Sequence, residues 1–174
     1  MTGCARWLGV AFALLVLISI GCCALINSAE LRTGFPSGID YDRVLAFDSQ
    51  SGFRGGCMFI GYELDEDSAK QLLRSPRAER LVTMDRPGDR HLYTPYRETS
   101  ALLTNGRDWA GADGKSRNLF ALGAEGGCGD GAHALPYATE LLTERGNLAS
   151  VSGNGEGLSI ISPARRLVLF LYFG

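Results

Sequence analysis

An uncharged run of twenty residues, Trp7 to Ile26, constrains this chain more than any other stretch. Wound as an α-helix at ~1.5 Å per residue, it reaches ~30 Å, the thickness of the hydrocarbon core of a bilayer. Its polar side chains are Ser19 and the thiols of Cys22 and Cys23, which are small enough to bond to the helix backbone. A buried helix in a globular core would need a larger chain around it. We therefore expect residues 1–27 to hold a transmembrane anchor or an uncleaved signal.

The processing of this segment leaves three alternatives open. The apolar run exceeds the usual ~7–15 residue core of a cleaved signal peptide, which favours a retained anchor. Ser19-Ile20-Gly21-Cys22 is similar to a bacterial lipobox and makes Cys22 a candidate for lipidation, although that pattern usually has Leu, Val or Ile in place of Ser19. A loose small-x-small site at Cys22-Cys23-Ala24 would instead release the body of the protein.

The charges that flank the run predict its orientation. Arg6 precedes it, whereas Glu30 and Arg32 follow it with mixed sign, which favours an amino terminus inside the cytoplasm. The C-terminal domain is then extracytoplasmic, in the periplasm or at the cell surface. Arginine far outnumbers lysine, which occurs only at Lys70 and Lys115, as is common in proteins from GC-rich bacterial genomes. The sequence therefore predicts a single-pass protein of a bacterial envelope.

Composition limits what the rest of the chain can be. The net charge of −2 argues against nucleic-acid binding, which needs a concentrated basic surface for phosphate contacts. The remaining length suits one domain of ordinary size. Gly34, Pro36 and Gly38 interrupt both helix and sheet, so residues 28–40 are predicted to form a tether and residues 41–174 the domain.

Strands are predicted near both ends of the domain. Arg43 to Asp48 alternates as a short strand, Ser49 to Gly56 forms a turn, and Cys57 to Leu64 forms the next strand. A period of two places the following residues of that second strand on its expected core face: Met58, Ile60, Tyr62 and Leu64. Leu158 to Ser162 and Leu167 to Phe173 are expected to form a C-terminal β-hairpin, with the last strand buried on both faces.

Two to three helices are expected between these strands. Asp65 is placed to cap a helix whose apolar stripe is Ala69, Leu72 and Leu73 and which ends at Ser75-Pro76. A second helix begins near Pro136 and ends before Gly146. The weaker patterns predict a strand at 81–84, a short helix at 98–104 and a strand at 118–122. The predicted fold class is α+β, with a mostly antiparallel sheet.

The cysteines favour one disulfide bond in the domain. Cys4, Cys22 and Cys23 lie before or within the apolar run, which leaves Cys57 and Cys128 to pair with each other in an exported domain. The bond would close a loop of about seventy residues and contribute roughly 4 kcal/mol by the chain-entropy model. Two separate buried thiols remain the alternative.

Motifs for cofactors and metals are incomplete. Gly127 to Ala132 matches G-x-G-x-x-A, but Pro136 separates it from the following helix, and the acidic residue of a dinucleotide site is not evident. Asp113 to Ser116 resembles the end of a phosphate-binding loop, but Trp109 occupies the position of its first glycine. His91 and His133 lack the spacing of metal ligands. No cofactor, metal or catalytic residue is therefore predicted.

One stretch, His91 to Arg97, is a candidate for partner binding. His91, Tyr93, Tyr96 and Arg97 combine types that carry contact energy at interfaces with a proline-containing segment. The alternative is that both tyrosines pack at the edge of the core.

The function predicted from these features is a membrane-anchored extracytoplasmic domain that binds a protein partner in the envelope, without catalytic activity. One alternative is a small envelope hydrolase that uses Asp130 and His133 in the glycine-rich loop. The other is an accessory subunit whose apolar helix packs in a membrane complex through Gly9 and Gly21.

Overall fold

A computed structural model describes residue 32 and residues 34–52, 55–84, 93–99, 108–110, 116–118 and 135–173. The chain separates into two compact units, residues 1–33 and 34–174. All the helices and strands named here belong to the second unit.

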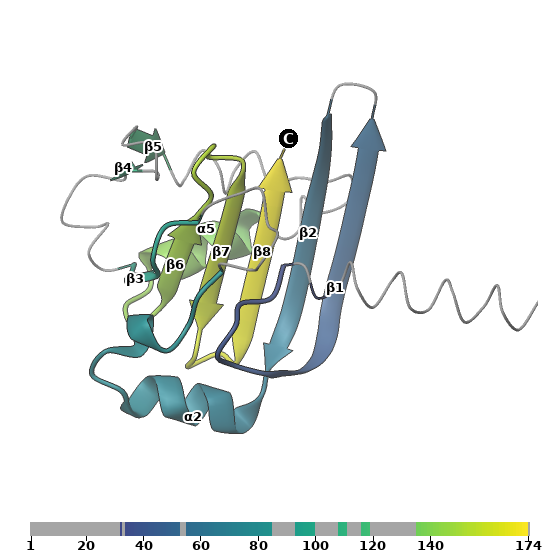
Figure 1. Cartoon of the computed structure of the whole chain (residues 1–174). Coiled ribbons are helices and arrows are strands. Elements are labelled where there is room, and N and C mark those ends of the chain that lie inside the picture. Colours follow the sequence, from purple (N-terminus) through teal and green to yellow (C-terminus); the bar gives the residue numbers. More distant parts are fainter. Residues whose placement is uncertain are drawn as a thin grey trace, which may run out of the picture. The chain divides into compact units, whose positions relative to one another are not determined.

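The second unit is built on a six-stranded antiparallel sheet with the strand order β1-β2-β8-β7-β6-β3 (Figure 1). Its strands are β1 (Tyr41–Gly52), β2 (Gly55–Leu64), β3 (Arg97–Glu98), β6 (Leu148–Val151), β7 (Gly157–Ser162) and β8 (Leu167–Phe173). A separate pair consists of β4 (Asp108–Ala110) and β5 (Ser116–Asn118). The helices are α2 (Glu66–Arg74), the 3₁₀ turn η1 (Ala78–Arg80) and α5 (Leu135–Thr143). The prediction of an antiparallel sheet with few helices is therefore confirmed for the described residues.

The C-terminal hairpin forms as predicted. β7 and β8 pair from Gly157↔Tyr172 to Ser162↔Leu167, and Arg166 adopts a positive φ of 51° in the turn between them. β8 also pairs with β2, so it lies inside the sheet rather than at an edge. Its alternating residues therefore meet protein on both sides, which explains why this strand is apolar at every position.

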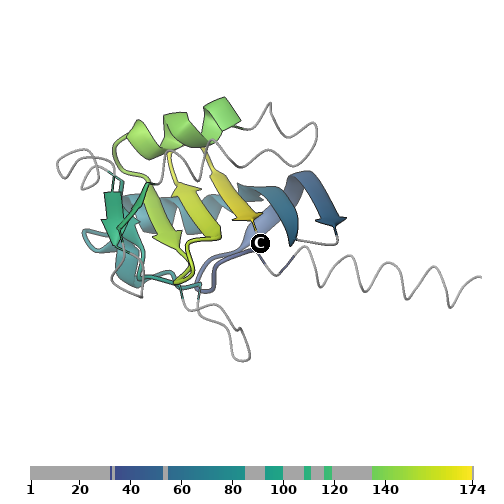
Figure 2. The same ribbon diagram turned by 90° about the horizontal axis from the view of Figure 1, so that it is seen from above.

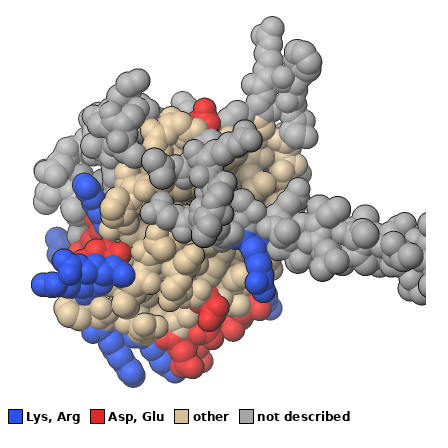
Figure 3. Space-filling view, in the orientation of Figure 1, with Lys and Arg blue, Asp and Glu red and all other residues tan. Residues whose placement is uncertain are grey.

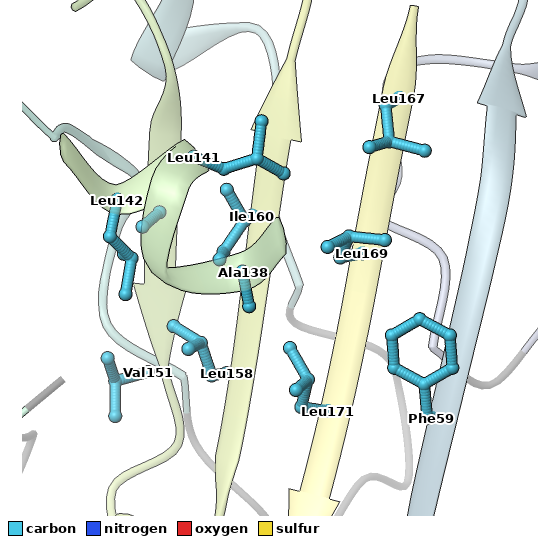
Figure 4. Packing of buried hydrophobic residues seen from close by; sticks show 11 residues of the cluster. Phe59, Ala138, Leu141, Leu142, Val151, Leu158, Ile160, Leu167, Leu169 and Leu171 are labelled. Atoms are coloured by element: carbon cyan, nitrogen blue, oxygen red, sulfur yellow. The ribbon is translucent and has the colours of Figure 1, made fainter. Parts of the chain in front are cut away.

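One face of the sheet packs against α5 (Figure 2). Ala138, Leu141 and Leu142 of the helix are fully buried, and they meet side chains from four neighbouring strands (Figure 4). The strand residues of this cluster are Phe59, Ala149, Val151, Leu158, Ile160, Leu167, Leu169 and Leu171. The predicted helix near Pro136 is thus confirmed, and Gly146 follows it with a φ of 82°, a conformation that suits glycine.

The opposite face of the sheet is also buried. The rings of Phe35, Tyr41 and Tyr62 form a cluster with centroid distances of 4.7 to 5.2 Å. Ile60 and Val168 lie on the same face and are fully buried. Burial of hydrophobic side chains on both faces makes the sheet the centre of the fold.

Residues 34–40, part of the predicted tether, pack on the domain. Phe35 and Ile39 are 5% and 8% exposed, and the backbone N–H of Ser37 donates to the carbonyl of Thr83 at 2.7 Å. A Cβ on Gly34 would lie 2.6 Å from the ring of Phe170, so only glycine fits there without a shift. Residues 34–40 therefore belong to the same compact unit as residues 41–174.

The β1–β2 hairpin is longer than predicted. The ladder continues to Gly52↔Gly55, so most of the turn expected at 49–56 is strand. On β2, Ile60, Tyr62 and Leu64 are fully buried on the predicted core face, whereas Met58 is partly exposed. Phe59 is buried too, because the other face of the sheet carries α5.

Helix α2 begins as predicted, but its buried side consists of Ser68, Ala69 and Leu72 and does not include Leu73. The Asp65 carboxylate accepts a hydrogen bond from the backbone N–H of Ser68 at 2.9 Å, and Ser75 caps the C-terminus. Ser68 lies on the inner side because its hydroxyl accepts a hydrogen bond from the Asp40 backbone N–H at 3.0 Å. Leu73, predicted to be buried, is consequently 60% exposed.

The weaker predictions between the helices have mixed outcomes. Residues 81–84 contribute an isolated bridge, Ser37↔Thr83, instead of a full strand. Glu98, expected to begin a short helix, lies in β3 beside β6. Asn118 ends β5, and the rest of the strand predicted at 118–122 lies outside the described residues.

Candidate interaction surface

The predicted binding residues of the stretch at 91–97 have different environments. Tyr93 and Tyr96 are only 9% and 1% exposed, whereas Arg97 is exposed. His91 lies outside the described residues. The two tyrosines are therefore buried, and their environment matches the alternative in which they pack at the edge of the core.

Hydrogen bonds hold this stretch against β6 and β7. The Tyr96 hydroxyl lies 2.7 Å from Ser159 Oγ, and both side chains are buried. Ser150 Oγ donates to the carbonyl of Thr94 at 2.5 Å, and the Thr94 backbone N–H donates to the carbonyl of Val151 at 2.8 Å. The contact with Ser159 gives Tyr96 a structural role that its residue type alone did not reveal.

Cys57 is disulfide-bonded. The other four cysteines lie outside the described residues, so the pairing with Cys128 and the lipidation of Cys22 stay predictions. Cys57 sits in β2 opposite Gln50 of β1, near the end of that hairpin where the chain turns. A bond at this position would secure the hairpin that forms one edge of the sheet.

The anchor and both alternative functions involve residues outside the described ranges. Trp7 to Ile26, Asp130 and His133 all lie there, as do Gly9 and Gly21. Among the described residues, no helix is long and apolar enough to cross a membrane. The same residues contain no group of three or more His, Cys, Asp or Glu side chains that could hold a metal ion.

Strand β1 is the longer of the two edge strands of the described sheet. It has twelve residues, whereas β3 at the opposite edge has two, and no described strand pairs with the outer side of β1. Leu45 and Phe47 are 50% and 44% exposed on it, and they are two of the three large exposed hydrophobic side chains among the described residues. An edge of this kind presents backbone N–H and C=O groups that another strand can pair with. β1 is therefore the best candidate interaction surface in the described structure.

Two irregularities bend the first half of β1. The register with β2 shifts between Tyr41 and Arg43 and again between Val44 and Ala46. Such bulges increase the local twist of a strand and change the face on which the next side chains lie. From Ala46 to Gly52 the ladder is regular, so this half offers the straighter edge.

Charged side chains surround the start of β1. Arg166 donates from Nη2 to the Asp42 carboxylate at 2.5 Å and from Nε to the carbonyl of Leu64 at 3.1 Å. Arg43 Nε lies 2.5 Å from Glu63 Oε2, while 71% of the Arg43 side chain stays exposed. The Arg166 contacts fasten the C-terminal hairpin turn to the beginning of β1 and the end of β2, and the Arg43 contact joins β1 to β2.

A second group of charged side chains lies on α2. Acidic and basic side chains both lie along the lower edge of the molecule, where α2 is located (Figure 3). The hydrogen bond and charge of Lys70 lower the pKa of Glu66, whose carboxylate lies 2.5 Å away, and Glu66 in turn raises the pKa of Lys70. The backbone N–H of Ser68 lowers the pKa of Asp65. These charges pair within one helix, and we assign them a structural role.

Comparison with protein-family models, with curated proteins and with solved structures finds no match to this chain. The candidate surface therefore rests on the physical features of β1. The sequence predicted a strand at 43–48, but its position at the edge and the exposure of Phe47 emerge only in the folded domain.

Proposed function

We propose that this chain is a membrane-anchored, extracytoplasmic domain of the bacterial envelope that binds a protein partner along the free edge of β1. The anchor at Trp7 to Ile26 and the orientation given by Arg6 come from the sequence. The observation that carries the binding role is the long outer edge of β1 with Leu45 and Phe47 exposed on it.

The chemistry of an edge strand supports this mode of binding. An added strand forms main-chain hydrogen bonds that contribute affinity, while pockets and side chains along the edge select the partner. Phe47 offers a large apolar surface beside those hydrogen-bonding groups. The disulfide bond at Cys57 supports the extracytoplasmic location, because such bonds persist in oxidising compartments.

The test is affinity capture of the tagged full chain from detergent-solubilised membranes, with the wild type compared with Phe47→Lys. A charged side chain on an edge opposes strand addition, so the variant should lose the stoichiometric partner that the wild type retains. Leu73→Lys is the matched control, because Leu73 is even more exposed but lies on α2, and this variant should retain the partner.

Thermal unfolding of the three proteins tests whether both substitutions leave the domain folded. The proposal is wrong if the wild type captures no stoichiometric partner, including a second copy of itself. It is equally wrong if Phe47→Lys and Leu73→Lys retain the same amount of partner.

A further inference from the structure

We infer that the partner of the β1 edge is a second copy of this chain, paired antiparallel about a two-fold axis near Leu45 and Ala46. The inference rests on the proposed binding role of β1 and names its partner. It is carried by the register of β1 and by the charges at its two ends.

The bulge in β1 brings two opposite charges onto one face. In a regular strand, Arg43 and Asp48 would point to opposite faces, because they are separated by an odd number of residues. Here Arg43 pairs with Glu63 and Asp48 pairs with Phe59, and those two β2 residues share a face of the sheet. The register shift between Val44 and Ala46 therefore places Arg43 and Asp48 on the same face.

The same shift aligns two apolar residues on the other face. Val44 pairs with Tyr62 and Phe47 pairs with Ile60, and both β2 partners belong to the face opposite α5. Residues 43–48 of β1 thus form a symmetric pattern. The charges of Arg43 and Asp48 lie at its ends, the apolar Val44 and Phe47 lie inside them, and the bulge lies at its centre.

A two-fold axis through the bulge makes this pattern complementary to itself. In that antiparallel arrangement, Arg43 lies opposite Asp48 of the second copy, and Asp48 lies opposite Arg43 of the second copy. Val44 and Phe47 face each other across the interface in the same reciprocal way. Such a self-complementary patch is what an isologous dimer requires, and opposite charges across neighbouring strands stabilise their pairing.

The two charges are available for such contacts. Arg43 is mostly exposed, and among the described residues its contact is the one from Nε to Glu63, so its Nη groups can reach a carboxylate on an added strand. Asp48 is partly exposed, on a strand whose outer side has no described partner. Pairing would also cover Phe47, which is 44% exposed in the single chain.

The test uses two differently tagged copies of the full chain, produced together and purified through one tag in detergent. The measured quantity is the amount of the second copy that co-purifies. Arg43→Glu places two carboxylates opposite each other at both ends of the interface, and Asp48→Lys does the same with two cations. Each variant should therefore associate with itself about tenfold more weakly than the wild type.

The distinguishing measurement mixes the two variants. An Arg43→Glu copy paired with an Asp48→Lys copy has opposite charges at both ends, so this mixture should recover association close to that of the wild type. Lys70→Glu, which reverses an exposed charge on α2, is the matched control and should associate like the wild type. A folding defect in either variant would persist in the mixture. Recovered association therefore reports the charge contact between the copies.

A mixture that associates no better than either variant alone would overturn the inference, as would a wild type without self-association. The proposed function would survive that result if Phe47→Lys still loses a different captured protein. Loss of association in every variant including Lys70→Glu would also overturn the inference, since the effect would then not be specific to β1.

Discussion

Replacing Tyr96 with phenylalanine tests whether this residue supports the fold or contacts a partner. The substitution keeps the ring but removes the hydroxyl that lies 2.7 Å from Ser159 Oγ, in a site where the two side chains are 1% and 0% exposed. A buried polar group left without its partner costs about 1–3 kcal/mol. At roughly 3–5 °C for each kcal/mol in a domain of this size, Tyr96→Phe should lower the Tm by several degrees.

The assay is thermal unfolding of the detergent-solubilised full chain, followed by intrinsic fluorescence, for a double-mutant cycle. Ser159→Ala should destabilise by a similar amount, and the double variant by about 1 kcal/mol less than the sum of the two. Tyr41→Phe is the control, because no hydrogen bond of the Tyr41 hydroxyl is found among the described residues. An unchanged Tm for Tyr96→Phe, or effects that simply add, would refute the buried hydrogen bond.

Three further perturbations test the domain. Gly34→Ala should destabilise the domain by about 1–3 kcal/mol in thermal unfolding, because the new Cβ would lie 2.6 Å from the buried ring of Phe170; an unchanged Tm would place Gly34 outside the domain. Leu171→Ala should cost about 2–5 kcal/mol, seen as a lower urea midpoint, because it leaves a cavity beneath α5; a loss below 1 kcal/mol would contradict that packing. Since the Ser68 N–H lowers the pKa of Asp65 in the folded state, the capping contribution is present above the ordinary pKa of 3.8 and lost as the pH falls through the lower folded value. Asp65→Asn, which caps without ionising, should weaken that acid dependence of the Tm, and an identical pH profile would exclude the role of this carboxylate.

Local features of the sequence were sufficient to predict several helices and strands. Asp65 caps α2 because its carboxylate reaches a backbone N–H only three residues ahead. The C-terminal hairpin follows from two apolar strands on either side of a four-residue turn, and its strands lie where the pattern predicted them. In both cases the deciding contacts lie close together in the chain, so the pattern of residues contains them.

Contacts between distant parts of the chain were not predictable in this way. The sequence contains no signal that β8 inserts between β2 and β7, an arrangement that buries Phe59 as well as Ile60. The burial of Tyr96 depends on Ser159, which lies 63 residues away in the chain. Exposed and buried tyrosines have the same residue type, and only the strand order separates them.

The candidate surface on β1 also combines a feature that was predictable from local sequence with features that were not. The alternation of Arg43 to Asp48 was enough to predict a strand, but not its free edge or the bulge that places both charges on one face. A bulge changes side-chain parity by a single residue, and a period of two in the sequence cannot reveal where that shift occurs.

The apolar segment at Trp7 to Ile26, the cap at Asp65 and the strand character of the last residues could be predicted from the sequence, because each depends on neighbouring residues and on solvent. Long-range contacts determine which described strand lies at the edge, how residues 34–40 pack and which tyrosines are buried. The physical reason is that burial depends on what packs against a residue. In this fold, the partners of Gly34, Tyr96 and Phe59 come from strands far away in the chain.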